Sequence, residues 1–301
     1  MADRPLSRPL AARAHVDYLV RRAEDVEELR RTLSSQRAYA AYALGQLQPA
    51  LFPRSEWWSA RSAQGQALLV HSRGGLGSAL FAFGDVDGLE ALLRLHPGPR
   101  HTFLTCEVRH LPIVLRRYSV SEHQSMLRML ADREGFRPFE GRARRLSGRD
   151  VRQINQLYRS DGTAAFYSAQ NVDEAVYYGA YDGERLVAVA GTHVISGVDG
   201  IAVVGNVFTH PKYRGRGLGT LVTGAVTQHI LSAGCREVVL SVDPRNGPAV
   251  RAYQRLGFRE VGRLIEGAAV RRDLGIAAAF RRWVAGARGR RYGAQLVSIA
   301  T

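Results

Sequence analysis

The chain has 301 residues, of which 46% are hydrophobic and 23% are charged, the composition of an ordinary globular protein long enough for two domains. No run approaches the ~18 apolar residues of a membrane span, and the first fifteen residues lack the apolar core of a secretory signal. The formal charge of +15 comes almost wholly from arginines spread through both halves, which argues against a dedicated nucleic-acid surface.

The N-terminal half predicts a mixed α/β unit. Residues 1–15 are basic and rich in Pro and Ala, and we expect a disordered tail there. Residues 16–137 form the first predicted domain. The glycine cluster Arg73–Gly77 lies between two strand-like runs and opens no helix, so it predicts a hairpin turn, not a phosphate loop. The expected elements are a helical region at 23–47, strands at 57–60, 67–71 and 78–83, a helix at 85–93, a strand at 101–106 and a short helix at 111–118.

Residues 138–143 predict a linker, and residues 144–301 predict a second domain. Its first strand (143–146) leads through the N-cap candidate Ser147 into a helix. After the last predicted strand, a C-terminal amphipathic helix carries Ile276, Phe280, Trp283 and Val284, a stripe typical of a core or an interface. The remaining elements are helices at 150–158 and 171–176, strands at 177–180, 186–194, 201–209, 237–242 and 258–265, and helices from 218 and from 248.

A glycine-rich loop joins the strand at 201–209 to the following helix. The first N–H groups of a helix have no intrahelical partner, and the helix dipole places partial positive charge there. Glycines let a bulky anion approach these N–H groups, and arginines add full charges. The loop therefore predicts a cradle for a diphosphate, built from Arg214, Gly215, Arg216, Gly217, Leu218, Gly219 and Thr220.

Two familiar phosphate loops are ruled out. A P-loop needs a lysine after its glycines, but Lys212, the only lysine in the chain, precedes them. A dinucleotide fingerprint counted from Gly215 would need a glycine where Thr220 stands. What remains is the pattern R-x-x-G-x-G.

A second motif follows the strand at 237–242. It reads N-x-x-A-x-x-x-Y-x-x-x-G-F, and its helix ends at Gly257, the residue type expected in the left-handed position after a helix. Together the two ordered motifs resemble the signatures of the GNAT superfamily of N-acetyltransferases. The second motif consists of Asn246, Ala249, Tyr253, Gly257 and Phe258.

The resemblance implies an α/β fold with a mixed sheet (α+β), in which 144–301 is the acyl-CoA-binding domain. The order of elements in residues 16–137 resembles the degenerate N-terminal domain of two-domain GNAT proteins such as the glycine N-acyltransferases. Such a domain would lack a CoA site, and it would close over the acceptor site or hold a homodimer.

Site residues follow from the resemblance. The exposed edge of the central strand, at Val207, Phe208 and Thr209, would hold the pantetheine arm by backbone hydrogen bonds. The loop from Arg214 to Thr220 would bind the diphosphate, and Asn246 would contact the CoA arm. Tyr253 would be the general acid, because a tyrosine hydroxyl with a pKa near ~10 can protonate a thiolate whose thiol has a pKa near ~8.5.

The general base stays open. Many relatives carry a glutamate early on the central strand, but residues 201–205 contain no carboxylate. His193, Glu266 or a chain of water molecules remain as alternatives. No motif identifies the acceptor, so glycine-like amino acids, polyamines, aminoglycosides and protein amino termini are all compatible.

Two functions compete at this point. The first is the transfer of acetyl from acetyl-CoA to a primary amine, and the second is a non-catalytic acyl-CoA sensor or basic scaffold. The two cysteines, Cys106 and Cys235, have neither metal-like nor redox spacing, which predicts a reducing cytoplasm and no metal. The expected partners are acetyl-CoA and an unidentified amine, without a membrane or nucleic acid.

Overall fold

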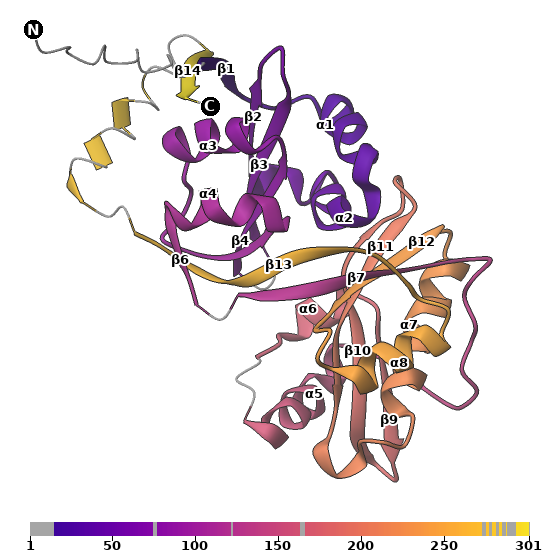
Figure 1. Ribbon diagram of the computed structural model, residues 1–301. Helices are drawn as coiled ribbons and strands as arrows, with labels where there is room; N and C mark the ends of the chain where they lie inside the picture. The colour runs from indigo at the N-terminus through magenta and orange to yellow at the C-terminus, as the bar shows by residue number, and fades with distance from the viewer. Residues whose placement is uncertain are drawn as a thin grey trace, which may run out of the picture.

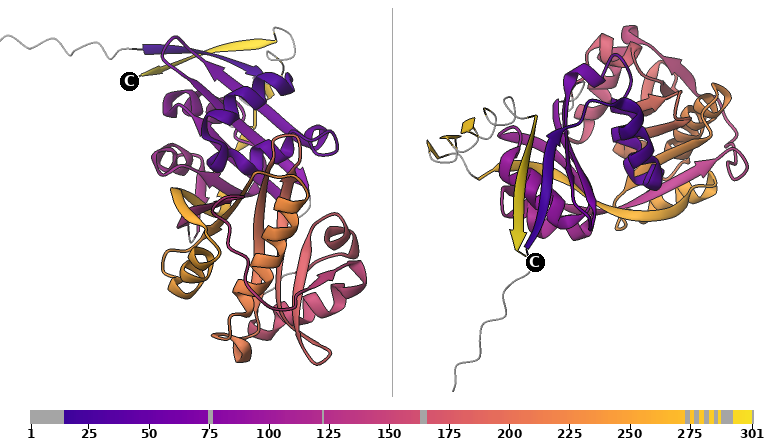
Figure 2. Two further views of the ribbon diagram at one scale, coloured as in Figure 1. Left: turned by 90° about the vertical axis from the view of Figure 1, so that its right-hand side faces the viewer. Right: turned by 90° about the horizontal axis from the view of Figure 1, so that it is seen from above.

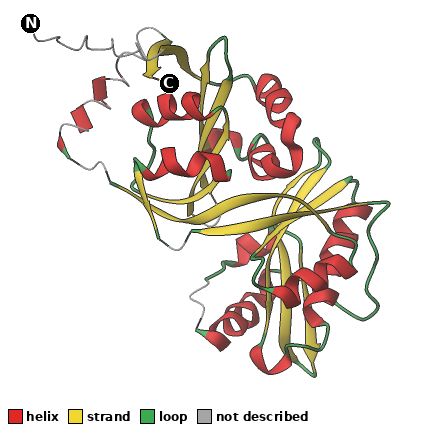
Figure 3. Cartoon of the chain, viewed as in Figure 1, coloured by secondary structure: helices red, strands yellow, loops and turns green. Residues whose placement is uncertain are grey.

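The computed structural model describes residues 15–74, 77–121, 123–162, 166–272 and 293–300, together with 275–276, 279–280, 283–284 and 287. Over these residues the strands form one mixed sheet, with helices on both of its faces (Figure 1; Figure 3). The strand order is β14-β1-β2-β3-β4-β5-β13-β7-β12-β11-β10-β9-β8, and β6 pairs beside this path with β13.

The N-terminal half begins with a strand whose side chains alternate strictly between buried and exposed over residues 15–20. Asp25 caps the helix that follows, and Asp85 caps α3, in each case by accepting backbone N–H groups of the first turn. Its elements are β1 (His15–Arg22), α1 (Val26–Leu33), α2 (Arg37–Gln46), β2 (Ser55–Arg61), β3 (Gln66–Gly74), β4 (Gly77–Gly84), α3 (Val86–Leu95), β5 (His101–Cys106), α4 (Leu111–Leu115), β6 (Tyr118–Val120) and β7 (Gln124–Asp132).

The C-terminal half repeats the order of the first. Each half runs strand, two helices, three strands, helix, strand, and in each the third of these three strands is parallel to the last. The elements of this half are β8 (Arg144–Leu146), α5 (Val151–Tyr158), α6 (Ala169–Asp173), β9 (Tyr177–Asp182), β10 (Arg185–Ser196), β11 (Ile201–Thr209), α7 (Leu218–Ser232), β12 (Glu237–Val242), α8 (Gly247–Arg255), β13 (Arg259–Arg271) and β14 (Ala294–Ala300).

Two long strands join the halves. Strand β7 closes the N-terminal sequence, yet it pairs with β12 and β13 of the second half. Strand β13 pairs with β7 over its first part and with β5 over its second part, so it crosses from one half to the other (Figure 1). Strand β14 returns to the first half and pairs with β1, and the two lie side by side in both views of Figure 2. The two halves therefore share one sheet.

Helix α2 packs on one face of the sheet in the second half. Its buried alanines and Leu44 belong to the same core cluster as Val203 of β11 and Val239 of β12. Helices α7 and α8 pack on the opposite face, where they bury Val238 and Leu240 of β12. At the rim, Arg37 forms an ion pair with Glu237 at 2.8 Å. Helix α2 thus places residues of the first half against the centre of the second-half sheet.

Several predicted elements are confirmed. Strand β11 has the expected bounds, and the strands on either side of the glycine cluster pair antiparallel, with Gly74 opposite Gly77. The helical region predicted at 23–47 begins at Val26 and divides into α1 and α2. The predicted short helix ends at Leu115, because Tyr118 belongs to β6.

The prediction missed β1, β6, β7 and β14. The expected tail lies outside the described residues except for His15, which begins β1. The described positions of the C-terminal helical segment are helical, and Ile276, Phe280 and Trp283 are exposed there, while the rest of that segment lies outside the described residues. No helix among the described residues has the length and hydropathy needed to cross a membrane.

Candidate active site

The central strands β11 and β12 separate part of the way along their length. Ile201, Ala202 and Val203 pair in parallel with Glu237, Val238 and Val239, and beyond these residues the two strands, which are described in full, do not pair with each other. From residue 204 to residue 209, the edge of β11 that faces β12 has no strand partner. The predicted pantetheine residues Val207, Phe208 and Thr209 lie on this open edge and are half-buried. Such an edge can accept an extended ligand as an added strand.

Asn206 marks the point of separation. It has a φ of 53°, the only positive value among described residues other than glycine. Two tyrosines hold it: the Tyr158 hydroxyl donates to the Asn206 carbonyl at 2.6 Å, and the Asn206 amide donates to the Tyr177 hydroxyl at 2.9 Å. Sequence reasoning missed this residue, although an asparagine within a β-branched run is disfavoured in strands and could have indicated it.

The loop after β11 forms the expected opening of a helix. Gly215 and Gly217 have φ values of 81° and 78°, which residues with a Cβ rarely adopt, and Gly217 is the N-cap of α7. The backbone N–H groups of Leu218, Gly219 and Thr220 lie in the first turn, where no intrahelical acceptor is available. A Cβ at Gly219 would find only the Thr209 hydroxyl within 4 Å, at 3.5 Å. The helix start therefore leaves room for an anion.

The two loop arginines differ in their contacts. Arg214 is tied down, because its guanidinium donates to Asp161 at 2.9 Å and to the Thr209 carbonyl at 3.2 Å. Arg216 is exposed, with its guanidinium 5.0 Å from the centre of the Tyr213 ring. Arg214 thus braces the end of β11, and Arg216 is the arginine that a ligand can reach more freely.

Helix α8 carries the second motif. The side chain of Asn246 caps it by accepting the Ala249 N–H at 3.2 Å. Tyr253 is 7% exposed, and its ring packs 6.1 Å from that of Phe258. Burial raises the pKa of the Tyr253 hydroxyl to about 12, so this hydroxyl keeps its proton at neutral pH. Within the described chain it has no hydrogen-bond partner, which leaves its proton available to a ligand.

A second polar cluster lies across the sheet, on the face covered by α2. At its centre is Arg128 of β7, which is 2% exposed. Its guanidinium donates to the Ala38 carbonyl at 2.9 Å and to the Ser241 hydroxyl at 3.0 Å, and it lies 5.1 Å from the centre of the Tyr42 ring. Ser241 in turn donates to a carboxylate oxygen of Glu266 at 3.2 Å. Arg128 and Ser241 are direct cross-strand partners.

The two candidate bases both belong to this cluster. Burial raises the pKa of the Glu266 carboxyl, with Arg128 and the Ser241 hydroxyl opposing that rise. Burial, together with the nearby charge of Arg128, lowers the pKa of His193 to about 4. His193 is nevertheless an exposed residue, so solvent reaches it although protein groups surround its imidazole. It also lies 5.8 Å from the centre of the Tyr42 ring.

Gly205 sets the position of His193. A Cβ at residue 205 would overlap the imidazole of His193, so only glycine lets that ring lie against β11. Gly205 lies shortly beyond Val203, the last residue of β11 that pairs with β12, so His193 lies at the start of the separation of these two strands. Ser241 lies beyond Val239, the last residue of β12 that pairs with β11. The structure thus places His193, Glu266 and Arg128 around the gap between the two strands.

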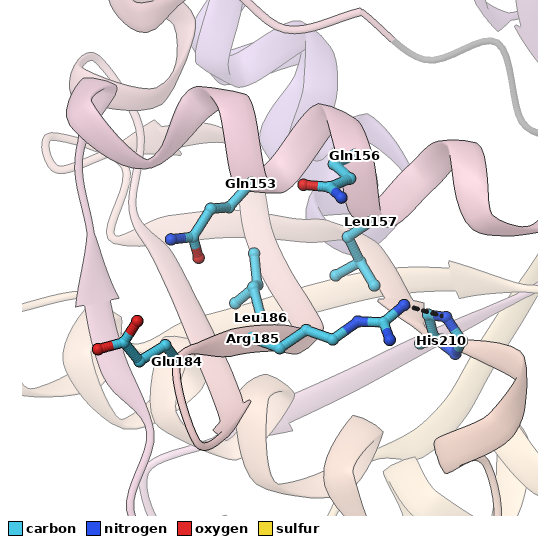
Figure 4. A pocket seen from close by; sticks show the side chains of 7 residues that line it. All are labelled: Gln153, Gln156, Leu157, Glu184, Arg185, Leu186 and His210. Carbon is cyan, nitrogen blue, oxygen red and sulfur yellow. Dashed lines mark hydrogen bonds between the residues drawn. The ribbon is translucent and has the colours of Figure 1, made fainter.

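A separate pocket of about 320 Å³ lies beside α5 (Figure 4). The Arg185 guanidinium and a ring nitrogen of His210 approach to 2.8 Å at one end of it. Among the residues predicted from sequence to bind CoA or act in catalysis, none lines this pocket, so it is not the predicted site. Its lining consists of Gln153, Gln156, Leu157, Glu184, Arg185, Leu186 and His210.

Comparison with known proteins points to the same family as the two sequence motifs. The model of the Acetyltransferase (GNAT) family matches residues 148–258. The chain is 37% identical over 90 residues to the mycothiol acetyltransferase of Geodermatophilus obscurus, and 50% identical over 46 residues to the protein of that name from Corynebacterium aurimucosum. These matches cover 29% and 15% of this chain and the same shares of the relatives. The chain thus spans less than a third of the length of these curated relatives.

Solved structures extend the likeness to both halves. An X-ray structure of a Drosophila protein has a TM-score of 0.61 at 15% identity and covers 84% of this chain and 97% of that one. A GCN5-related N-acetyltransferase from Sphaerobacter thermophilus has a TM-score of 0.52 at 18% identity, covering 86% of this chain and 98% of that one. At these identities the likeness concerns the fold.

Proposed function

Residues 148–258 belong to the GNAT acetyltransferase family, and on that premise we propose that the chain transfers acetyl from acetyl-CoA to a primary amine. The observation that carries the proposal is the open edge of β11, followed after the glycine-rich loop by the free N–H groups at the start of α7. One surface offers strand-like hydrogen bonds to the pantetheine amides, and the next offers N–H donors to the diphosphate. A thioester held this way would lie at the separation of β11 and β12.

The acceptor would meet the thioester from the face covered by α2. An amine in water carries a proton, so it must lose that proton before it attacks. Glu266 suits this task better than His193, because burial raises the pKa of Glu266 while it lowers that of His193 to about 4. One proton of the ammonium passes to Glu266 and the free amine attacks the thioester carbonyl. Backbone N–H groups of β11 at its separation from β12 would then face the developing oxyanion.

Collapse of the tetrahedral intermediate breaks the C–S bond. The CoA thiolate leaves and takes the proton of the Tyr253 hydroxyl, and the attacking nitrogen loses a second proton to solvent as the amide forms. Solvent then returns a proton to Tyr253 and Glu266 releases its proton to solvent, so each turnover releases one proton in all. The raised pKa of Tyr253 ensures that the hydroxyl is protonated when the thiolate departs.

The N-terminal half should bind no CoA. At the position equivalent to the glycine-rich loop, β4 ends at Gly84 and Asp85 caps α3 directly. The Asp85 carboxylate accepts the Gly88 N–H at 2.8 Å and the Tyr18 hydroxyl, and Asp87 adds a second acid in the first turn. This helix start is therefore filled by a carboxylate that would repel a phosphate. Titration calorimetry should give one CoA per chain, and a stoichiometry of two would contradict the assignment.

Thiol release from acetyl-CoA across a panel of primary amines tests the proposed function. We expect acetyl-CoA to bind and at least one amine to accelerate thiol release over the amine-free rate. Binding without turnover of any amine would favour the alternative of an acyl-CoA sensor. Absence of acetyl-CoA binding would reject both.

A further inference from the structure

We propose that the acceptor site is shared by the two halves and selects a primary amine that carries no carboxylate on its α-carbon. The inference rests on the proposed function and narrows its substrate class. It derives from the cluster of Tyr42, Arg128, His193, Ser241 and Glu266, whose members come from α2, β7, β10, β12 and β13. Tyr42 and Arg128 precede the predicted linker, so the second half alone does not complete this cluster.

The cluster lies on the face of the sheet from which the acceptor amine would approach. It flanks the gap between β11 and β12 on the face opposite α7 and α8, the helices that carry the diphosphate loop and Tyr253. An amine that attacks a thioester held in the gap must approach from a face that the CoA arm leaves free. His193 is an exposed residue, so solvent reaches this face near Gly205.

The charges of the cluster define what can bind. Glu266 is half-buried, and one of its carboxylate oxygens accepts from Ser241, which leaves further lone pairs for an ammonium. Arg128 is the one formally cationic member, and the protein already uses it. Its three nitrogens donate to Ala38, Ser241 and Tyr39, at 2.9, 3.0 and 3.4 Å, and its face lies on the Tyr42 ring.

An α-amino acid would therefore fit badly. Its ammonium would lie near Glu266, and its carboxylate, only two bonds away, would face the same buried carboxylate without a free guanidinium to balance it. Like charges that face each other in such a place disfavour binding. An amino alcohol, an amino sugar, a polyamine or the first residue of a peptide presents the ammonium without this second charge.

Matched acceptors test the inference. L-alanine and L-alaninol have amines of similar basicity and differ in a carboxylate against a hydroxymethyl group. With acetyl-CoA and the full chain, we expect kcat/KM for L-alaninol to exceed that for L-alanine by about 10-fold or more. Equal values or a preference for L-alanine would overturn the inference, as would failure of every amino alcohol while acetyl-CoA binds. Failure of acetyl-CoA to bind would instead reject the proposed function.

Glu266→Gln separates selection from a purely catalytic role. If Glu266 binds the ammonium and repels the carboxylate, the variant should have a lower kcat/KM for L-alaninol. The ratio of kcat/KM for L-alaninol to kcat/KM for L-alanine should then fall toward one. If Glu266 acts only as a base, both rates fall by the same factor and the preference is kept, which would contradict the inference. Glu260→Gln is the matched control, since Glu260 lies on the same strand, is exposed and pairs with Arg263 at the surface.

Discussion

Replacing Tyr253 by phenylalanine is expected to lower kcat by about 10²-fold or more while leaving the affinity for acetyl-CoA nearly unchanged, because the proton is lost and the buried ring is kept. The hydroxyl has no hydrogen-bond partner among the described residues, so its removal leaves no buried group unpaired. Stopped-flow measurement of thiol release, with acetyl-CoA affinity measured by calorimetry, checks both parts. The defect should shrink with a thioester whose thiol is more acidic, since such a thiolate needs protonation less.

The pH dependence gives an independent readout. With a pKa of about 12, the Tyr253 hydroxyl stays protonated up to about pH 11. Below that pH, the wild-type rate should therefore show no fall with rising pH that disappears in the Tyr253→Phe variant. Tyr178→Phe serves as the control, because Tyr178 is a part-buried tyrosine whose hydroxyl lies 3.2 Å from His229, outside the proposed site. A Tyr253→Phe enzyme with wild-type kcat would refute the assignment of the general acid.

Replacing Gly219 by valine is expected to weaken acetyl-CoA binding by about 10- to 100-fold, the loss that follows when one charge-assisted hydrogen bond of ~1.5–3 kcal/mol is blocked. Gly219 is a cleaner target than Gly217. Gly217 has a φ of 78°, so a side chain there would strain the backbone as well as block the ligand. Gly219 has no such constraint, and its Cβ would meet nothing closer than the Thr209 hydroxyl at 3.5 Å.

Calorimetry on Gly219→Val, with thermal unfolding alongside, separates blocked binding from lost stability. Gly197→Val is the matched control: Gly197 is exposed in the turn between β10 and β11, its φ is not positive, and a Cβ there meets nothing within 4 Å. We expect Gly197→Val to bind acetyl-CoA normally. Unchanged affinity in Gly219→Val would refute the anion cradle at the start of α7.

The parts of the site that depend on local sequence could be predicted. The strand β11, the left-handed glycines at 215 and 217, and the helix carrying Tyr253 are each encoded within a few residues, by β-branched runs, glycine chemistry and helical spacing. The apolar residues Val16, Tyr18 and Val20 of β1 could also have indicated a strand, although the apolar Leu19 breaks the alternation.

The acceptor side could not be predicted, because its residues meet only through tertiary structure. Arg128 stands in the middle of the buried strand β7, where a charge argues against a strand. What stabilises it there is the Ala38 carbonyl, 90 residues away, and the Ser241 hydroxyl, 113 residues away. Asn206 likewise acquires its positive φ from Tyr158 and Tyr177, neither of which is its neighbour in sequence.

The strands shared by the two halves also determine when folding can be completed during synthesis. Strand β5 cannot pair with β13 until the ribosome has added more than a hundred further residues, and β1 cannot pair with β14 until more than two hundred have been added. Until then the nascent N-terminal half exposes unpaired strand edges, which are templates for mispairing. Contacts this distant in sequence also slow folding. Both halves should thus become protease-resistant together, late in translation, and not one after the other.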